Sequence, residues 1–119
     1  MKALEGLLVA DFTQAFSGPF CTMNLADHGA RVIKVEKGGG GDMLRDAGPF
    51  DGQHHSLYFA AGNRGKESIY LDLAKEEDKQ LAWAIIGKAD ILIENFRPGV
   101  MEKLGFGYQQ VCGVNPNII

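Results

Sequence analysis

Leu7-Leu8-Val9-Ala10-Asp11-Phe12 is the stretch of sequence that decides the fold class, together with the turn at Ser17-Gly18-Pro19 that follows it. A short and nearly continuous apolar run is typical of a strand that is covered on both faces. Pro19 suits the first position of a helix, because the N–H that it lacks has no partner there. We expect this helix to end at His28-Gly29, where glycine supplies a left-handed exit.

The same alternation continues along the chain. Further strands are predicted at Val32–Glu36, Ser68–Leu73 and Ile91–Phe96. Helices or helical turns are predicted at Ser56–Ala61, Lys75–Lys88, Val100–Leu104 and Tyr108–Cys112, and a new strand is predicted to begin within Pro116–Ile119. Strands that alternate with helices imply an α/β fold with right-handed crossovers and a mostly parallel sheet. Because a parallel sheet that stopped there would expose an apolar edge, we expect the chain to be truncated.

The segment Lys75–Lys88 has the clearest helical pattern. Acidic residues lie in its first turn, where the positive end of the helix dipole favours them. Apolar residues form (i, i+4) pairs on the face that we predict to be buried, namely Leu81, Ala82, Ile85 and Ile86. Trp83 on the same helix is expected to belong to the core.

Length, composition and charge exclude several classes of protein. A chain of 119 residues has room for one domain, and 45% hydrophobic and 23% charged residues are ordinary for a globular protein. The formal net charge of -3 gives no electrostatic reason to expect nucleic acid or an anionic membrane as a partner. No apolar run approaches the roughly 20 residues of a membrane span, and the N-terminus lacks a signal-peptide pattern. We therefore expect a cytoplasmic protein.

Three predicted loops lie at the carboxyl ends of strands, where open parallel sheets bind ligands. Thr13–Pro19 opens a helix, whose free N–H groups can receive an anion. Lys37 and Gly38–Gly41 follow the second strand, and Asn95–Gly99 follows the fourth. A nucleotide diphosphate or a similar ligand would suit the three cations of this region, Lys37, Arg97 and Lys103. The alternative is that these are ordinary solvated loops.

Two well-known nucleotide motifs are missing. Gly38–Gly41 does not give GxGxxG, because Met43 occupies the position of the last glycine. Gly62–Glu67 fails the P-loop pattern both in its length and in its final hydroxyl residue. The sequence therefore argues against a nucleotide-dependent dehydrogenase and against a P-loop NTPase.

Other residues with reactive side chains are given structural roles. Cys21 and Cys112 form no CxxC pair, so we expect two reduced, buried thiols and no metal. Ser17 lacks the surroundings of a GxSxG nucleophile and is expected to cap a helix or to form a turn. Asp11 and Asp72 have no second carboxylate beside them, and we expect both to be structural.

His54 and His55 are adjacent, and the sequence offers them no HExxH motif and no carboxylate partner. Adjacent side chains point apart on any regular backbone. We therefore expect both histidines on a loop surface.

Taken together, a series of segments carries a resemblance over nearly the whole chain. The most diagnostic runs from Ala89 to Val100 and contains Glu94-Asn95-Phe96-Arg97-Pro98-Gly99. The others occur in order as Leu4–Thr13, Ser17–Thr22, Leu25–Glu36, Gly40–Asp42, Arg45, Tyr58-Phe59, Asn63–Lys66, Ser68, Leu71–Leu73, Leu104-Gly105 and Asn115-Pro116. In this order they resemble the N-terminal part of the family III CoA-transferases, the group of formyl-CoA transferase and carnitine CoA-transferase.

The resemblance implies a Rossmann-like domain that binds coenzyme A, with residues 1–119 as the N-terminal part of the large domain of an interlocked homodimer. The implied substrates are an acyl-CoA and a carboxylic acid, and no permanently bound cofactor is implied. CoA moves between them through an aspartyl-CoA thioester, which is covalent catalysis by a carboxylate. The CoA contacts map by resemblance onto Ala15, Phe16, Ser17, Lys37, Leu71, Asp72, Leu73, Ala74, Asn95, Phe96, Lys103 and Leu104.

Two features depart from the family pattern. Phe16 stands where the formyl-CoA transferases place a glutamine near the reacting carbonyl, which argues against formyl or oxalate specificity. The catalytic aspartate of the family lies beyond Ile119, so neither Asp11 nor Asp72 is that residue. We expect no catalytic residue in this chain and no turnover by the chain alone. The alternatives are an α-methylacyl-CoA racemase of the same family and a non-catalytic CoA-binding or dimerisation module.

Overall fold

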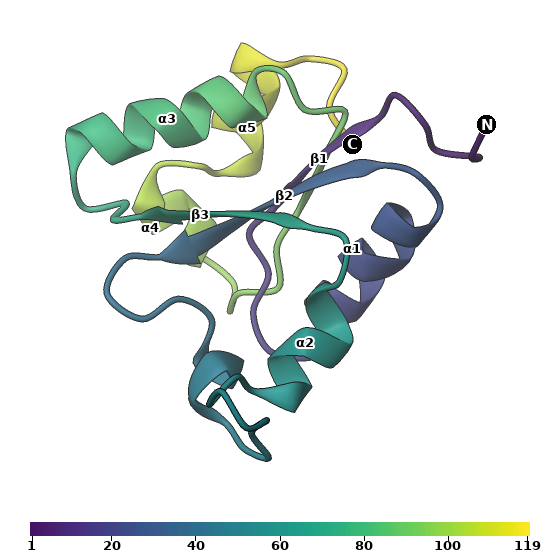
Figure 1. The fold of residues 1–119 in the computed structure, drawn as a ribbon. Coiled ribbons are helices and arrows are strands. Elements are labelled where there is room, and N and C mark those ends of the chain that lie inside the picture. Colours follow the sequence, from purple (N-terminus) through teal and green to yellow (C-terminus); the bar gives the residue numbers. More distant parts are fainter.

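A four-stranded parallel sheet forms the centre of the computed structural model, which describes residues 1–119 (Figure 1). Its strands lie in the order β3-β2-β1-β4 and are β1 (Leu8–Asp11), β2 (Arg31–Lys37), β3 (Glu67–Leu71) and β4 (Ile91–Ile93). The chain runs outward from β1 to β3 and then crosses back to β4, as in doubly wound folds. The predicted α/β fold is confirmed, and the switch point of the strand order lies between β1 and β4.

Helices cover both faces of this sheet. They are α1 (Ser17–Asp27), α2 (Leu57–Asn63), α3 (Glu76–Ile86), α4 (Val100–Leu104) and α5 (Tyr108–Val114), with a short 3₁₀ helix, η1 (Met43–Asp46), that was not predicted. In Figure 1, α1 and α2 lie on one side of the sheet, and α3, α4 and α5 lie on the other. None of these helices has the length and apolar character needed to cross a membrane.

The ends of α1 agree only partly with the prediction. Gly29 follows the helix with a φ of 107°, which confirms the left-handed exit. The helix begins at Ser17, two residues before the predicted first position at Pro19, and the N-terminus of the helix has no side-chain cap. Ser17 was predicted to cap a helix or to form a turn; it does not cap the helix, because it lies inside the first helical turn instead of before it.

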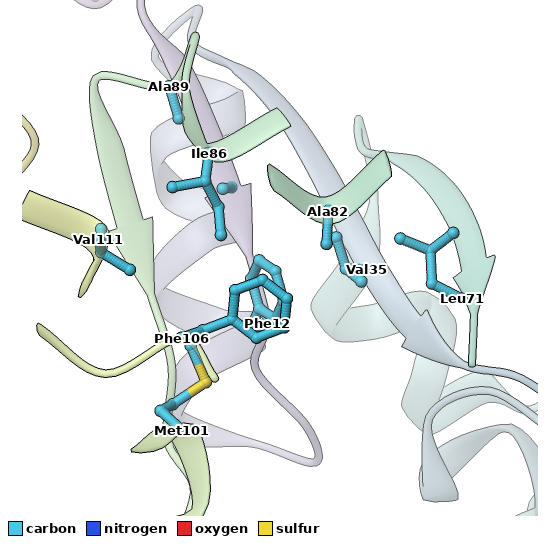
Figure 2. Close-up of a cluster of buried hydrophobic side chains, with 10 residues drawn as sticks. Phe12, Val35, Leu71, Ala82, Ile86, Ala89, Met101, Phe106 and Val111 are labelled. Atoms are coloured by element: carbon cyan, nitrogen blue, oxygen red, sulfur yellow. The ribbon is translucent and has the colours of Figure 1, made fainter. Parts of the chain in front are cut away.

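The main hydrophobic core lies between the sheet and α3, α4 and α5 (Figure 2). Phe106 is at its centre: its ring centroid lies 5.9 Å from that of Phe12 and 4.8 Å from that of Trp83. Trp83 itself is half-buried against this core. The other buried members are Ala10, Val35, Leu71, Ala82, Ile86, Ala89, Met101 and Val111.

The predicted buried face of α3 needs one correction. Ala82 and Ile86 are fully buried and Ile85 is half-buried, but Leu81 is 50% exposed. Successive residues of a helix lie about 100° apart around its axis. The buried stripe is centred on Ala82 and Ile86, so Leu81 falls on its flank, where no other element covers it.

The C-terminal segment, where a new strand was predicted to begin, forms no strand and pairs with the sheet only through its last residue. Ile119 donates its N–H to the carbonyl oxygen of Asp90 at 3.0 Å and accepts from the N–H of Leu92 at 2.9 Å. These are the two bonds of a parallel bridge to β4. A pairing through one residue is too short to count as a strand.

The opposite face of the sheet is apolar at its amino end and charged at its carboxyl end. Val9 and Val32 pack toward α1, whereas Asp11, Lys34 and Glu36 come later on the same face and are almost completely buried. Each of these charges has a partner of opposite sign: Lys66 for Asp11, Asp42 for Lys34 and Arg45 for Glu36. Buried charges of this kind are tolerated only when they are paired and hydrogen-bonded.

Asp11 accepts four hydrogen bonds in the interior, as many as Glu36, which fits the structural role expected of it. One carboxylate oxygen accepts from the N–H and the hydroxyl of Thr13, and the other accepts from the Thr22 hydroxyl at 2.6 Å and from Lys66 Nζ at 3.0 Å. Lys66 Nζ also donates to the carbonyl oxygen of Pro19 and to Asn63 Oδ1. Burial lowers the pKa of Lys66, although the adjacent Asp11 carboxylate favours the charged form.

Replacement of Lys66 tests the importance of this pair for stability. We expect Lys66→Met, which keeps most of the aliphatic stem, to lower the free energy of unfolding by about 3–5 kcal/mol, because it leaves Asp11 buried without a counter-charge. Urea unfolding measures the change. Arg31→Met is the matched control, since it removes the exposed ion pair with Glu67 and should change stability little. Equal effects of the two substitutions would contradict the prediction.

Candidate functional site

The carboxyl ends of all four strands surround one cavity of about 270 Å³. Phe12 and Gln14 follow β1, and Phe96 follows β4, so the cavity spans the switch point of the sheet. The rest of the lining comes from the ends of β2 and β3, the turn after β3 and helix α4: Val35, Glu36, Lys37, Leu71, Asp72, Leu73, Ala74 and Leu104.

The structure brings most of the predicted site residues together at this cavity. Seven of them line it: Lys37, Leu71, Asp72, Leu73, Ala74, Phe96 and Leu104. Ala15, Phe16 and Ser17 line a second hollow of about 370 Å³. Asn95 and Lys103 line neither of the two.

The second hollow is aromatic and open. Phe16 is 62% exposed, and its ring meets that of Tyr58 edge to face, with centroids 5.9 Å apart. Phe20 of α1 and Ala61 and Gly62 of α2 complete the lining. The loop after β1 therefore contributes to both hollows, Gln14 to the first and Ala15 to the second.

The three cations predicted to act together do not share one cavity. Lys37 is exposed at the rim of the first cavity. Arg97 lines a different hollow of about 340 Å³, together with Glu94 and Glu102. Of the three predicted cations, Lys37 alone lines the cavity at the carboxyl ends of the strands.

Glu36 holds the glycine loop against the sheet. Its carboxylate accepts from Arg45 Nε at 2.7 Å, from Arg45 Nη2 at 2.6 Å, from Ser68 Oγ at 2.6 Å and from the N–H of Asp42 at 2.8 Å. The Arg45 guanidinium in turn lies 3.7 Å from the centre of the Phe59 ring. Gly41 fits here because it has a φ of 78° and because a Cβ would come within 2.4 Å of Glu36 Oε2.

The hydrogen bonds to Glu36 dominate its electrostatics. Burial by itself would raise the pKa of Glu36, but the bonds from Arg45, Ser68 and the Asp42 N–H outweigh it and lower the pKa to about 2. Glu36 is thus a structural carboxylate at the edge of the cavity and is ionised at neutral pH.

Some site residues were not predicted from the sequence. Phe12, Val35 and Glu36 line the first cavity and are immediate neighbours of predicted residues or loops at the ends of β1 and β2, whereas Gln14 lies within the predicted loop Thr13–Pro19. The rule that ligands bind at carboxyl ends of strands could have included them. Asp42 was missed as well, although an aspartate before a short helix is a common N-cap, and its carboxylate accepts from the N–H of Leu44.

Several predictions about reactive side chains are corrected. Cys21 is exposed and Cys112 is half-buried, so the two thiols are free but not buried, because each lies toward the outer side of its helix. His54 and His55 lie on a surface loop as predicted. His55 does have a carboxylate partner, however, since its Nδ1 lies 3.1 Å from Asp51 Oδ2 across a tight turn.

Asp72 is half-buried in the turn after β3. Its carboxylate accepts from the N–H of Ala74 at 3.1 Å, and its own N–H donates to Asp78 Oδ2 at 2.7 Å. These bonds shape the turn that lines the first cavity. No group of three or more histidine, cysteine or acidic side chains is placed to hold a metal ion.

Comparison with known proteins shows the family of this chain. Residues 4–119 match the model of CoA-transferase family III, and the chain belongs to that family. It is 51% identical over 115 residues to the acetyl-CoA:oxalate CoA-transferase of Acetobacter aceti, which covers 97% of this chain and 29% of that protein. It is 45% identical over 123 residues to the succinyl-CoA:mesaconate CoA-transferase of Haloarcula hispanica, and this match covers 100% of this chain and 31% of that protein.

Solved structures agree with the family. A CAIB/BAIF family protein from Brucella suis has a TM-score of 0.93 at 38% identity over 99% of this chain and 32% of that chain. Rv3272 from Mycobacterium tuberculosis has a TM-score of 0.91 at 43% identity, covering 100% and 32%. The chain spans about three tenths of the length of the curated relatives that it matches.

The pH dependence of stability tests the environment of Glu36. Because its pKa lies below the ordinary value of 4.5, Glu36 contributes stability that is present above about pH 4.5 and is lost as the pH falls toward 2. Over this window we expect a loss of about 2 kcal/mol, less than the full shift would give because solvent screens part of the interaction.

Urea unfolding of the wild-type chain and Glu36→Gln across this pH window measures the loss. The variant is expected to be less stable at neutral pH and to show a shallower decline. Glu77→Gln, a change at an exposed glutamate of α3, is the control and should follow the wild type. Parallel profiles for the wild type and Glu36→Gln would contradict the prediction.

Proposed function

We propose that residues 1–119 form the coenzyme-A-binding part of an acyl-CoA:carboxylate CoA-transferase. The observation that carries this proposal is the cavity at the carboxyl ends of the four strands, which gathers Lys37 and Leu71–Ala74 in a chain of CoA-transferase family III. Leu71, Leu73 and Phe96 offer apolar surface for a nucleotide base, and Lys37 at the rim offers a cation for phosphate. A nucleotide base and phosphate groups are both parts of coenzyme A.

The relatives support transfer as the reaction. Their names describe the movement of CoA from acetyl-CoA to oxalate and from succinyl-CoA to mesaconate, that is, from a thioester to a carboxylic acid. Our proposal extends the same reaction class to the protein of which this chain is part. It favours transfer over racemisation and over a binding module, and it includes the cytoplasmic, interlocked homodimer that the resemblance implies.

In the proposed mechanism an aspartate carboxylate attacks the thioester carbonyl carbon, and the CoA thiolate leaves to give a mixed anhydride. The thiolate then attacks the aspartyl carbonyl, which releases the donor acid and forms an aspartyl-CoA thioester. Asp11 is unsuited to this role, because it is fully buried and both of its oxygens are hydrogen-bonded. By resemblance to the family we place the nucleophile outside residues 1–119, and we propose that the part described here holds CoA.

Calorimetric titration with CoA, with NAD as the control ligand, tests the site. We expect saturable binding of CoA, and Lys37→Ala should weaken it about five- to tenfold, because one cation at the phosphate is worth about 1 kcal/mol. Lys88→Ala removes an exposed lysine just before β4, at the opposite end of the strands, and should leave the affinity unchanged. CoA binding that is indifferent to Lys37→Ala would place the site elsewhere, and no binding by the folded chain would contradict the proposal.

A transfer assay tests the position of the nucleophile. Incubation of the chain with an acyl-CoA and an isotopically labelled carboxylic acid should give no labelled thioester above the uncatalysed background. Turnover by residues 1–119 alone would show that one of the described carboxylates acts as the nucleophile, contrary to our proposal.

A further inference from the structure

The backbone of the loop Thr13–Ala15 is bonded by side chains from three other places in the chain: strand β2, the loop after β4 and the residue before η1. Lys34 Nζ donates to the carbonyl oxygen of Thr13 at 2.8 Å. The N–H of Gln14 donates to Asn95 Oδ1 at 2.9 Å, and the carbonyl oxygen of Gln14 accepts from Asn95 Nδ2 at 2.9 Å. The N–H of Ala15 donates to the two oxygens of Asp42 at 3.2 and 3.3 Å. These bonds fix the backbone of the loop.

Asn95 is bonded in a way that limits what else its side chain can do. Its side-chain amide accepts from the backbone N–H of Gln14 and donates to the carbonyl oxygen of the same residue. A rotation of this amide toward a ligand would break both bonds at once. Asn95 also lines neither of the two hollows that contain the other predicted contacts.

Asp42 fixes the other end of the loop from the interior. Its side chain is fully buried, and Oδ2 lies 2.9 Å from Lys34 Nζ, which is also buried. Ala15 has a φ of 63°, a left-handed conformation that is unfavourable for a residue with a Cβ. Such a conformation persists where the surroundings determine it, and here the Asp42 carboxylate holds the Ala15 N–H.

We propose that the side chains of Asn95 and Asp42 are positioning groups. They hold the Thr13–Ala15 loop and act on the ligand through that loop, without touching the ligand themselves. The loop brings Gln14 to the first cavity and Ala15 to the second hollow, so its geometry sets the shape of both. This assignment rests on the proposed function for the ligand, and it gives Asn95 a role different from the direct CoA contact expected by resemblance.

Asn95→Ala separates the two roles, because Asn95 is exposed and its loss should not unfold the chain. Amide hydrogen exchange of the ligand-free chain, followed by NMR, reports on the loop, and calorimetry reports on CoA affinity. We expect exchange of the Gln14 amide to become at least severalfold faster and the Kd for CoA to rise about three- to tenfold. Asn117→Ala, a change at an exposed asparagine outside the site, should alter neither.

Three results would decide against the proposal. A weaker affinity with unchanged exchange at Gln14 would show that Asn95 touches CoA directly. Faster exchange at Gln14 with an unchanged Kd would show that the loop geometry does not matter for binding. Unchanged exchange and unchanged affinity would remove both roles. If the wild-type chain binds no CoA, the proposed function fails, while exchange at Gln14 and Ala15 still supports or overturns the fixation of the loop.

Discussion

The buried pair between Asp11 and Lys66 is the interaction on which the rest of one face of the molecule depends. Asp11 ends β1 in the interior, where an uncompensated carboxylate would be very unfavourable. Lys66 follows 55 residues later, and its ammonium also bonds to Pro19 in α1 and Asn63 in α2. The Lys66 ammonium thus connects β1, α1, α2 and the segment that leads into β3. This face of the sheet is held by directional hydrogen bonds, whereas the opposite face is held by apolar packing.

The same arrangement repeats along β2 and leads to the site. Lys34 and Glu36 lie on the charged face of the sheet, and their partners, Asp42 and Arg45, come from the segment that follows the glycine loop. Because parallel strands end at one edge of the sheet, each buried charge fixes the backbone of a loop near the cavity. Glu36 holds the glycine loop, and Lys34 with Asp42 holds the loop after β1. The site is therefore shaped mainly by groups that lie beneath it.

The sequence predicts the parts of this structure that follow from periodicity and topology. Alternating strands and helices give the parallel sheet, and the position of loops after strands gives most of the cavity lining. Periodicity does not tell which element covers a residue, which is why Leu81 was placed in the core. It also does not reveal buried charges: in Val32-Ile33-Lys34-Val35-Glu36 the alternation suggests one solvated face, yet Lys34 and Glu36 are buried.

The ion-pair partners of the buried charges are distant in sequence or separated from them by glycines, so no local sequence pattern predicts these pairs. The spacing of residues along the sequence likewise does not show which side chains come together in space. Lys37 and Arg97 both follow strands, but the turn after β4 directs Arg97 toward Glu94 and Glu102 in a different hollow. The resemblance to a family could name Asn95 as important, whereas only the positions of its amide atoms show what it is bonded to.

Burial of ion pairs is weak grounds for high stability, since well-packed apolar residues often do as well or better. Their effect here is geometric, because a charged hydrogen bond fixes direction as well as distance. The exposed residues at the site, Lys37 and Phe16, project from a backbone that these buried pairs hold. Substitutions at such exposed positions alter ligand contacts and leave the fold intact, whereas a substitution at Lys34 or Asp42 alters the fold and the site together. Ligand preference can therefore change in this architecture without any change in the sheet.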